Sequence, residues 1–249
     1  MRLVDTARSY GLSEERIGRH LAHRRAELVL VTKVGYGVPG EADWTAGSVR
    51  RGIDEALAKL RTDVIDVVLL HSCGPEALRE GAVLEALEEA RRAGKIRAAG
   101  YSGEGAPLTL ALESGRVGVV ECSVNLCDQR GLERALPAAA ARGLGVIAKR
   151  PLANAPWRHA ERPAGQYVEP YWERWQAMGL DPGGLAWDEL ALRFSAHAPG
   201  VSCCIVGTTR VEHLRRAVAA VGRGPLPRDL QESVRAAFRA HDRGWEGQV

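Results

Sequence analysis

Short apolar runs rich in β-branched residues alternate with longer amphipathic segments along the chain. Runs such as LVLV and VVLL are apolar without interruption, rather than at every second position. A strand needs this continuity when both of its faces are covered, which indicates a parallel sheet. Seven runs are predicted to be strands: Arg2–Thr6, Leu28–Lys33, Val64–His71, Ile96–Ser102, Val117–Asn125, Gly145–Arg150 and Val201–Gly207.

The segments between these runs have the periodicity of amphipathic helices. Ser13, followed by two glutamates, is typical of a helix N-cap. Gly94, Gly115 and Gly143 directly follow predicted helices, as C′ glycines do. Nothing interrupts the alternation, so a single domain over 1–249 is predicted. The predicted helices are Glu14–Arg24, Ser48–Leu60, Leu84–Ala93, Leu108–Ser114, Gly131–Arg142, Trp187–Ala198 and Val211–Val221.

Alternating strands and helices over 249 residues are typical of a doubly wound sheet or of a (β/α)8 barrel. A doubly wound sheet should carry a Gly-rich phosphate turn after its first strand, but ARSYGLSEE lacks G-x-G-x-x-G. Polar residues at the C-terminal ends of the strands favour the barrel. Because seven strands are found and the first follows Met1 almost directly, we predict an α/β TIM-type barrel that lacks its first β-α unit. Its open seam would expose strand edges, so we expect either that the chain starts further upstream or that the barrel closes differently, for example in a homo-oligomer.

The charge and cysteine content exclude several other classes of protein. Thirty-four basic and 31 acidic residues are too balanced for nucleic-acid binding by charge alone. No apolar run reaches the roughly 18 residues that span a membrane, and the N-terminus does not resemble a signal peptide. The five cysteines lie in apolar surroundings, and no His/Cys spacing resembles a metal site. We therefore expect a cytoplasmic protein with reduced thiols and no metal, membrane or nucleic-acid partner.

Titratable residues stand at the C-terminal ends of three successive predicted strands, where barrel enzymes place their function. These residues are Asp5, Lys33 and His71, and Tyr10 follows Asp5 shortly. A single strand-end Asp or His is more often a structural hydrogen-bonding residue. Three in this order are harder to explain by structure alone, so the group predicts a catalytic site.

The sequence resembles the aldo-keto reductases. DTARSYGLSEERIG is similar to the family's D-T-A-x-x-Y-G-x-S-E signature, while VLVTKVG and VVLLHS carry its strand-end lysine and histidine. KIRAAGYSG, VNLCDQRGLE, VIAKRPLA and IVGTTRVEHL resemble its later strands in the same order. The resemblance covers essentially the whole chain. It implies an NAD(P)-dependent oxidoreductase that acts on a small carbonyl or alcohol, with Asp5, Tyr10, Lys33 and His71 as catalytic residues.

The chemistry of hydride transfer supports these four roles. Hydride delivered to a carbonyl carbon leaves negative charge on the oxygen, which then needs a proton. A free tyrosine has a pKa of about 10 and is a poor acid at neutral pH. We expect Lys33 to lower the pKa of Tyr10, the proton donor, and Asp5 to hold Lys33 charged and oriented. His71 is expected to orient the substrate by a hydrogen bond to its oxygen.

The resemblance also implies the cofactor contacts, with departures from the family pattern. Gly103, Glu121 and Lys149 stand where the family has an asparagine, a glutamine and an aromatic residue. The loop 207–210 leads into a helix, which suits a phosphate. Arg210 and the habit of the family favour NADP, with NAD as the alternative. The predicted cofactor-binding residues are Ser102, Glu121, Lys149, Arg150, Pro151, Leu152, Gly207, Thr208, Thr209, Arg210 and His213.

Two further predictions concern the surroundings of the nicotinamide. Glu121 and Lys149 lie near the ends of successive strands and are expected to form an ion pair, either in the pocket or on the outer surface. Trp44 and Trp157 are predicted to line the substrate pocket. A long loop over 153–184 carries Trp157 and is expected to cover the barrel mouth, although aromatic clusters at helical spacing are more often packing.

Two alternative functions from other classes of protein remain beside the oxidoreductase. One is a catalytically weak or inactive barrel that acts as a nucleotide-binding or regulatory protein. The other is a lyase or isomerase, which would need a metal or a pair of phosphate-binding glycines, and the lone Gly207 is weak support for it. The presence of all four catalytic residue types favours the enzyme.

Overall fold

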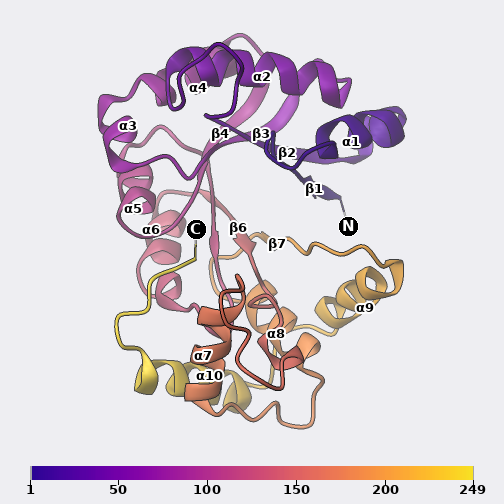
Figure 1. The fold of residues 1–249 in the computed structure, drawn as a ribbon, viewed down its shortest axis with the longest axis vertical. Coiled ribbons are helices and arrows are strands. Elements are labelled where there is room, and N and C mark those ends of the chain that lie inside the picture. Colours follow the sequence, from indigo (N-terminus) through magenta and orange to yellow (C-terminus); the bar gives the residue numbers. More distant parts are fainter. Residues whose placement is uncertain (1, 249) are drawn as a thin grey trace. The chain divides into compact units, whose positions relative to one another are not determined.

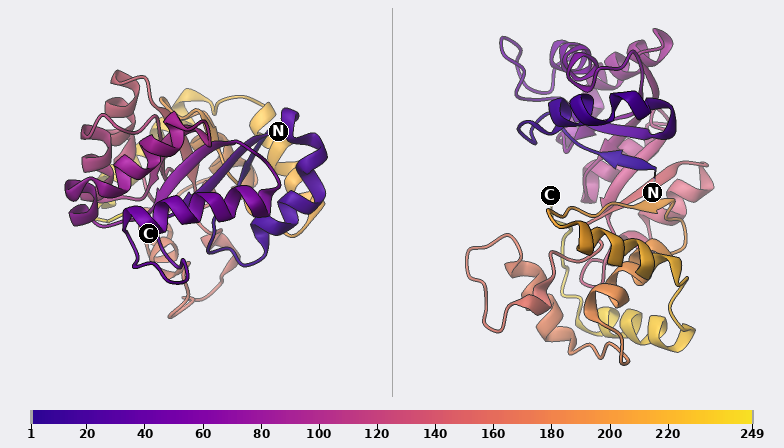
Figure 2. Two further views of the ribbon diagram at one scale, coloured as in Figure 1. Left: turned by 90° about the horizontal axis from the view of Figure 1, so that it is seen from above. Right: turned by 90° about the vertical axis from the view of Figure 1, so that its right-hand side faces the viewer.

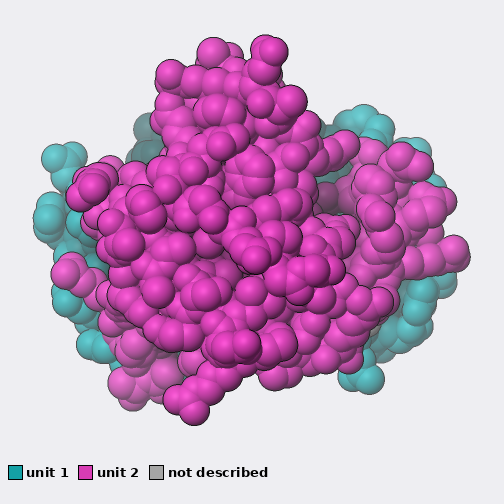
Figure 3. All heavy atoms as spheres, turned by 90° about the horizontal axis from the view of Figure 1, so that it is seen from below, with its two compact units in different colours: residues 1–121, 142–145, 249 teal, residues 122–141, 146–248 magenta. Residues whose placement is uncertain are grey.

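The computed structural model describes residues 2–248 and divides into two compact units (Figure 3). Among the described residues, unit 1 comprises 2–121 and 142–145, and unit 2 comprises 122–141 and 146–248. Seven strands are hydrogen-bonded in the order in which they follow one another in the sequence. This consecutive parallel order, with helices between the strands, is that of a (β/α)8 barrel with one β-α unit fewer.

The central strands of unit 1 are buried on both faces, as their uninterrupted apolarity predicts, whereas the first strand is only partly buried. Val31, Val68 and Leu70 are completely buried at the centre of the sheet. Neighbouring strands are parallel, so their C-terminal ends lie along one edge. The strands are β1 (Leu3–Asp5), β2 (Val29–Val34), β3 (Ile65–His71), β4 (Ile96–Ser102) and β5 (Val119–Ser123), of which unit 1 contains the part up to Glu121.

Three helices of unit 1, α1, α2 and α4, lie side by side and cover one face of its strands (Figures 1 and 2). Helix α2 begins with a capping box, in which the Thr45 side chain accepts from Ser48 N and the Ser48 hydroxyl accepts from Thr45 N. The helices of unit 1 are α1 (Ser13–Leu21), α2 (Ala46–Leu60), α3 (Pro75–Glu80), α4 (Ala82–Arg92), α5 (Gly105–Glu113) and the 3-10 helix η1 (Ala22–Glu27).

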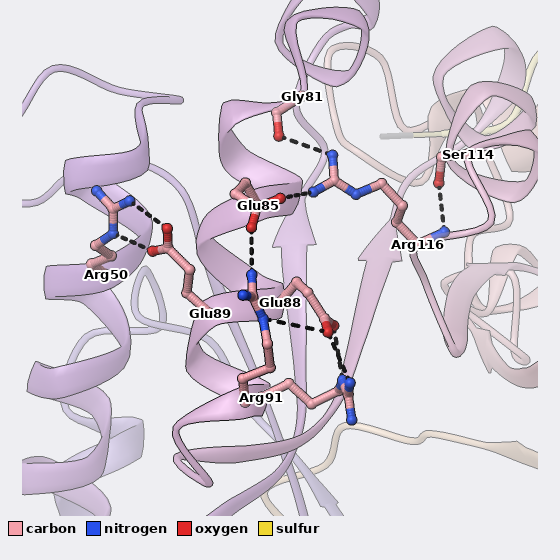
Figure 4. Close-up of polar contacts among 9 residues, drawn as sticks. Arg50, Gly81, Glu85, Glu88, Glu89, Arg91, Ser114 and Arg116 are labelled. Atoms are coloured by element: carbon pink, nitrogen blue, oxygen red, sulfur yellow. Dashed lines mark hydrogen bonds and ion pairs between the residues drawn. The ribbon is translucent and has the colours of Figure 1, made fainter.

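The solvent side of α4 carries an array of ion pairs (Figure 4). Glu85 pairs with Arg116 at 2.5 Å, and Glu89 pairs with Arg50 of α2 at 2.7 Å. Exposed pairs of this kind contribute under about 1 kcal/mol each. The buried face of α4, with Leu87 completely inaccessible, is therefore what fixes the helix against the sheet.

Unit 2 packs its helices around an apolar cluster of its own. Tyr171 of α7, Leu190 and Phe194 of α8, and Val234 and Phe238 of α10 are all buried in this cluster. The elements of unit 2 are α6 (Ala135–Ala141), β6 (Gly145–Lys149, whose first residue belongs to unit 1), α7 (Glu169–Met178), α8 (Trp187–Ala196), β7 (Cys203–Cys204), α9 (Val211–Gly222), α10 (Arg228–His241) and the 3-10 helices η2 (Arg130–Leu132) and η3 (Pro156–Arg158).

The predicted fold class is confirmed, with all seven predicted strands present in order. The three predicted C′ glycines adopt positive φ values, of 74° for Gly94, 66° for Gly115 and 68° for Gly143. The prediction for Ser13 is wrong, because the helix begins at Ser13 itself and its hydroxyl accepts a hydrogen bond from Thr6 instead of capping the helix.

Other elements differ from the predictions in length or were not predicted. Strand β7 has two residues, although a strand over Val201–Gly207 was expected. Helices α3, α7 and α10 were not predicted, and α7 lies in the segment 153–184 that was expected to be a loop. The single domain over 1–249 stays a prediction. All five cysteines are free, and no helix of residues 2–248 is long and apolar enough to cross a bilayer.

Candidate active site

The ends of β1, β2 and β3 bring three titratable side chains to one edge of the sheet in unit 1. Asp5 is the last residue of β1, Lys33 is the penultimate residue of β2, and His71 is the last residue of β3. Tyr10 follows in the turn between β1 and α1. That turn is held by two backbone hydrogen bonds, from Tyr10 N to Ala7 O at 3.0 Å and from Ser13 N to Tyr10 O at 3.1 Å.

The Lys33 ammonium is fully enclosed, with 1% of its side chain exposed. Its Nζ donates to both carboxylate oxygens of Asp5 at 2.6 Å and to the carbonyl oxygen of Thr6 at 3.1 Å. These contacts engage its three N–H donors. A carboxylate oxygen of Glu121 lies 3.4 Å from the same Nζ. A buried ammonium needs anionic partners to offset its lost hydration, and Lys33 has two.

The structure places Tyr10 between the ammonium and the imidazole. The Tyr10 ring is half exposed, at 50%, and its centroid lies 5.4 Å from Lys33 Nζ. The His71 ring stands edge to face with it, with 5.9 Å between the ring centroids. The four side chains that the sequence singled out thus form one cluster, with the phenol on its accessible side.

His71 is held from the opposite side by Tyr36, a residue that the sequence did not indicate. The Tyr36 hydroxyl lies 3.1 Å from His71 Nδ1, and the Ser9 hydroxyl lies 3.5 Å from the same atom. Trp44 packs on Tyr36 with 5.3 Å between the ring centroids, so Trp44 lies one ring away from His71. The signal for Tyr36 was its place in VTKVGYG, shortly after Lys33.

Ser102 and Glu121 face each other in the register of β4 and β5. The Ser102 hydroxyl donates to Glu121 Oε1 at 3.0 Å, and both side chains are buried. Glu121 Oε2 has no hydrogen-bond partner among the described residues. It lies 3.4 Å from Lys33 Nζ, so the lysine lies between the carboxylates of Asp5 and Glu121.

Burial and these two carboxylates shift the pKa values of the cluster. Burial, followed by the negative charge of Glu121, raises the pKa of Asp5 to about 7 despite the attraction of Lys33. Burial opposes the charge of Lys33, but Glu121 and Asp5 outweigh it and raise the pKa of Lys33.

The pKa of Tyr10 departs from the expectation. Burial raises it, and the negative charges of Asp5 and Glu121 act in the same direction, against the lowering effect of Lys33. Lys33 acts in the expected direction and lowers the pKa of Tyr10, but burial outweighs it and the net shift is upward. The physical reason is that burial of the phenol disfavours the phenolate by more than the charge of Lys33 favours it.

Unit 2 contains a cavity of about 1010 Å³ that gathers most of the predicted cofactor residues. Its wall includes three arginines, Arg158, Arg210 and Arg216, and the start of α9 directly follows the loop 207–210. The predicted cofactor residues in the wall are Leu152, Gly207, Thr208, Thr209, Arg210 and His213.

Trp157 lies in the wall of this same cavity. Its ring stacks on Trp187, with 5.9 Å between the centroids and 18° between the planes. Trp157 was predicted for the substrate pocket, and the structure instead groups it with the loop 207–210 and His213. Trp187 was not predicted for any site, because only the packing of η3 against α8 brings the two rings together.

Lys149, Arg150 and Pro151 lie at the end of β6, outside the wall of the cavity. Lys149 is buried, and its ion pair with Glu121 stays a prediction. The Arg150 guanidinium donates to the Ser123 hydroxyl at 3.0 Å, to the carbonyl oxygen of Gln248 at 2.6 Å, and to the Tyr167 hydroxyl. The carbonyl oxygen of Pro151 accepts from Ser195 at 3.1 Å.

A comparison with models of known protein families shows to which family the chain belongs. The model of the aldo/keto reductase family matches residues 1–237. The chain belongs to the aldo/keto reductase family. It is accordingly an NAD(P)-dependent oxidoreductase, and the resemblance seen in the sequence is confirmed.

Individual members of the family are distant relatives of the chain. L-galactose dehydrogenase of Arabidopsis thaliana is 28% identical over 87% of this chain and 72% of its own length. An uncharacterised oxidoreductase of Bacillus subtilis is 26% identical over 96% of this chain and 82% of its own. The solved structure of an aldo-keto reductase from Bacillus halodurans matches with a TM-score of 0.78 at 24% identity, covering 95% of this chain and 82% of that one, which supports the shared fold.

Proposed function

We propose that this aldo-keto reductase transfers hydride between NADPH, in preference to NADH, and a small carbonyl or alcohol, with Tyr10 as the proton donor. The observation that carries the proposal is the cluster in unit 1, in which Lys33 is buried against Asp5 and lies 5.4 Å from the Tyr10 ring. We further propose that the protein works in the cytoplasm as a homo-oligomer, which light scattering tests.

The residues of the cavity in unit 2 fit the adenosine phosphate end of this cofactor. Arg158, Arg210 and Arg216 supply positive charge, and the start of α9 supplies backbone N–H groups for a phosphate. The stacked pair of Trp157 and Trp187 offers an aromatic surface for the adenine.

Two buried groups in unit 1 fit the nicotinamide end. Glu121 Oε2 lacks a hydrogen-bond partner and can accept from the N–H groups of the carboxamide. The bound cofactor supplies the hydride from its nicotinamide ring. Ser102, which already donates to Glu121 Oε1, fixes the orientation of the acceptor.

The side chains of the cluster supply the proton that the carbonyl oxygen needs. As negative charge develops on the carbonyl oxygen, the Tyr10 hydroxyl donates its proton to it. In the tautomer in which Nδ1 of His71 accepts from Tyr36, Nε2 carries the proton and can donate a hydrogen bond to the same oxygen. Lys33 then stabilises the phenolate that remains on Tyr10. Oxidation of an alcohol runs through the same steps in reverse.

The test has two parts. Quenching of tryptophan fluorescence should report binding of NADPH, and absorbance should report its oxidation by an aromatic aldehyde. Because one relative acts on L-galactose, reduction of NADP⁺ with aldoses belongs in the same panel. Tyr10→Phe should lower turnover by about 10²–10⁴-fold and leave the Kd of NADPH unchanged. Full turnover in this variant would remove Tyr10 from the mechanism, and binding without any turnover would support the nucleotide-binding alternative.

A further inference from the structure

Lys33 has more negative charge around it than one ammonium can balance. Asp5 lies 2.6 Å from Nζ and Glu121 lies 3.4 Å from it, and both carboxyl groups are almost completely buried. The two acids also interact with each other. If both were ionised, Asp5, Glu121 and Lys33 together would carry a net charge of about −1, which a low-dielectric interior disfavours.

We propose that Glu121 is a positioning residue, a second counter-ion of Lys33 that keeps Tyr10 in its phenol form and so sets the enzyme towards carbonyl reduction. The proposal rests on the proposed role of Tyr10 as proton donor. It concerns the cofactor-free protein, in which Glu121 Oε2 has no hydrogen-bond partner among the described residues and lies 3.4 Å from Lys33 Nζ.

The geometry explains how Glu121 acts on Tyr10 through the lysine. An ammonium stabilises a neighbouring phenolate only to the extent that its own charge is not compensated. Asp5 engages Lys33 through both oxygens, and Glu121 adds a second negative charge on the same Nζ. The hydrogen bond from Ser102 holds Glu121 Oε1 and leaves Oε2 facing the ammonium. Burial is the largest cause of the raised pKa of Tyr10, and the negative charge of Glu121 acts in the same direction.

The protonation state of Tyr10 matters because the two reaction directions need opposite forms. In reduction, the O–H bond of Tyr10 breaks, its proton goes to the carbonyl oxygen and the electron pair stays on the phenolate, while the carbonyl carbon receives hydride from the nicotinamide cofactor. In oxidation, the phenolate must take the proton of the alcohol. A residue that disfavours the phenolate therefore favours reduction at neutral pH.

A titration of Tyr10 in the cofactor-free protein tests the proposal directly. Tyrosine labelled with ¹³C at Cζ reports phenolate formation by NMR, and the Tyr10 signal is the one that Tyr10→Phe removes. Glu121→Gln keeps the shape of the side chain and removes its charge. The pKa of Tyr10 should then fall by about one unit, the lower end of the effect of a nearby charge.

Glu14→Gln is the matched control. Glu14 is also a buried glutamate in unit 1, where it accepts from Thr32 at 2.6 Å and lies 4.0 Å from Lys59. It contacts none of Asp5, Lys33 and Tyr10 in the contacts described. Its loss should leave the titration of Tyr10 where it was, even if the protein becomes less stable.

Kinetics in both directions provide the second readout. In Glu121→Gln the alkaline limb of carbonyl reduction should move to lower pH, and alcohol oxidation at neutral pH should rise by about tenfold, in proportion to the phenolate. An unchanged Tyr10 titration in the folded variant overturns the proposal even if the wild type is an active reductase. If the wild type shows no turnover, both the proposed function and the role of Glu121 in the reaction direction are wrong. The NMR titration still decides whether the charge of Glu121 affects the pKa of Tyr10.

If Glu121→Gln fails to fold, Glu121→Asp is the second variant. Its shorter side chain places the carboxylate further from Nζ, so the pKa of Tyr10 should fall by less than is expected for Glu121→Gln. An unchanged pKa would again overturn the proposal.

Discussion

The Tyr36 hydroxyl lies 3.1 Å from Nδ1 of His71, and the two rings are 5.4 Å apart at an angle of 31°. A hydroxyl that donates to Nδ1 leaves the proton of a neutral imidazole on Nε2. Trp44, packed on the other side of Tyr36, keeps the phenol in place. The orientation and tautomer of His71 thus depend on a residue that follows Lys33 in the sequence.

Tyr36→Phe should lower kcat/KM for carbonyl reduction by about twofold to tenfold, the value of one ordinary hydrogen bond. The ring stays in place, but Nδ1 loses its donor and a fraction of His71 then carries its proton on the wrong nitrogen. Nitrogen NMR of the imidazole checks the tautomer. Tyr101→Phe is the control, because its hydroxyl donates to the carbonyl oxygen of Cys73, and it should change stability and leave His71 unaffected. A wild-type tautomer ratio in Tyr36→Phe would contradict the prediction.

Asp5 makes stability depend on pH in a direction unusual for a carboxylate beside a lysine. Its pKa is about 7 in the folded protein against an ordinary 3.8. Between about pH 4 and about pH 7 the native state therefore holds a proton that the unfolded chain has released. The free energy of unfolding should fall as pH rises through this window, by at most about 1.4 kcal/mol per pH unit.

Asp5→Asn removes this titration and should flatten the dependence across the same window. Denaturant unfolding at several pH values, followed by tryptophan fluorescence, gives the slope for the wild type and the variant. The difference between the two isolates Asp5 from the other titrating groups. Equal slopes would show that Asp5 titrates near its ordinary value.

The arginines of the cavity in unit 2 should decide between NADPH and NADH. Among the described residues, Arg210 and Arg216 contact acids only at long distance on the surface, at 3.9 Å to Glu212 and 3.8 Å to Asp188, so little is lost when a phosphate replaces these contacts. Arg210→Ala should weaken NADPH binding by about tenfold to a hundredfold, the value of a charge-assisted hydrogen bond, and leave NADH binding unchanged.

Arg215→Ala is the control for this measurement, because Arg215 lies on α9, which begins directly after Arg210, and does not line the cavity. It removes the same charge from the chain at almost the same place. Titration calorimetry with both cofactors compares the two variants. If Arg210→Ala weakened the binding of NADPH and NADH equally, Arg210 would not contact the additional phosphate of NADPH.

The strands and the cluster of four could be predicted from the sequence for one shared reason. Continuous apolar runs specify buried parallel strands, and parallel strands bring their C-terminal residues to one edge, so Asp5, Lys33 and His71 follow from pattern alone. The second partner of Lys33 could not be predicted in this way. Which of the buried residues on β5 turns towards Lys33 depends on side-chain rotamers and register, and these are set only by packing.

The pKa of Tyr10 could not be predicted from the sequence either. An ammonium next to a phenol predicts a lowered pKa, but the sign of the net shift depends first on how deeply the phenol is buried and then on every charge near it. Helix α10 was not predicted because most of its residues are polar or exposed. Of its fourteen residues, only Val234 and Phe238 are buried, too few to give a clear apolar stripe in the sequence. The stacking of Trp157 on Trp187 depends in turn on how η3 and α8 pack.

Gly18 provides a test of how tightly α1 is held behind the site. It lies in the middle of α1, and a Cβ atom there would overlap the backbone carbonyl of Lys59 at the end of α2. Backbone atoms cannot rotate away as a side chain can, so Gly18→Ala must push the two helices apart. We expect a loss of about 1–3 kcal/mol in the free energy of unfolding, despite the roughly 1 kcal/mol that alanine gains over glycine inside a helix.

The displacement should also reach the reaction, because α1 begins at Ser13 and the turn that holds Tyr10 is bonded to it. Turnover should fall in Gly18→Ala while NADPH still binds in the cavity of unit 2. Gly222→Ala is the control, since Gly222 also lies in a helix but a Cβ there meets nothing within 4 Å, and it should be neutral or stabilising. Denaturant unfolding of both variants decides the matter, because a Gly18→Ala protein as stable as Gly222→Ala would show that α1 is not packed backbone to backbone against α2.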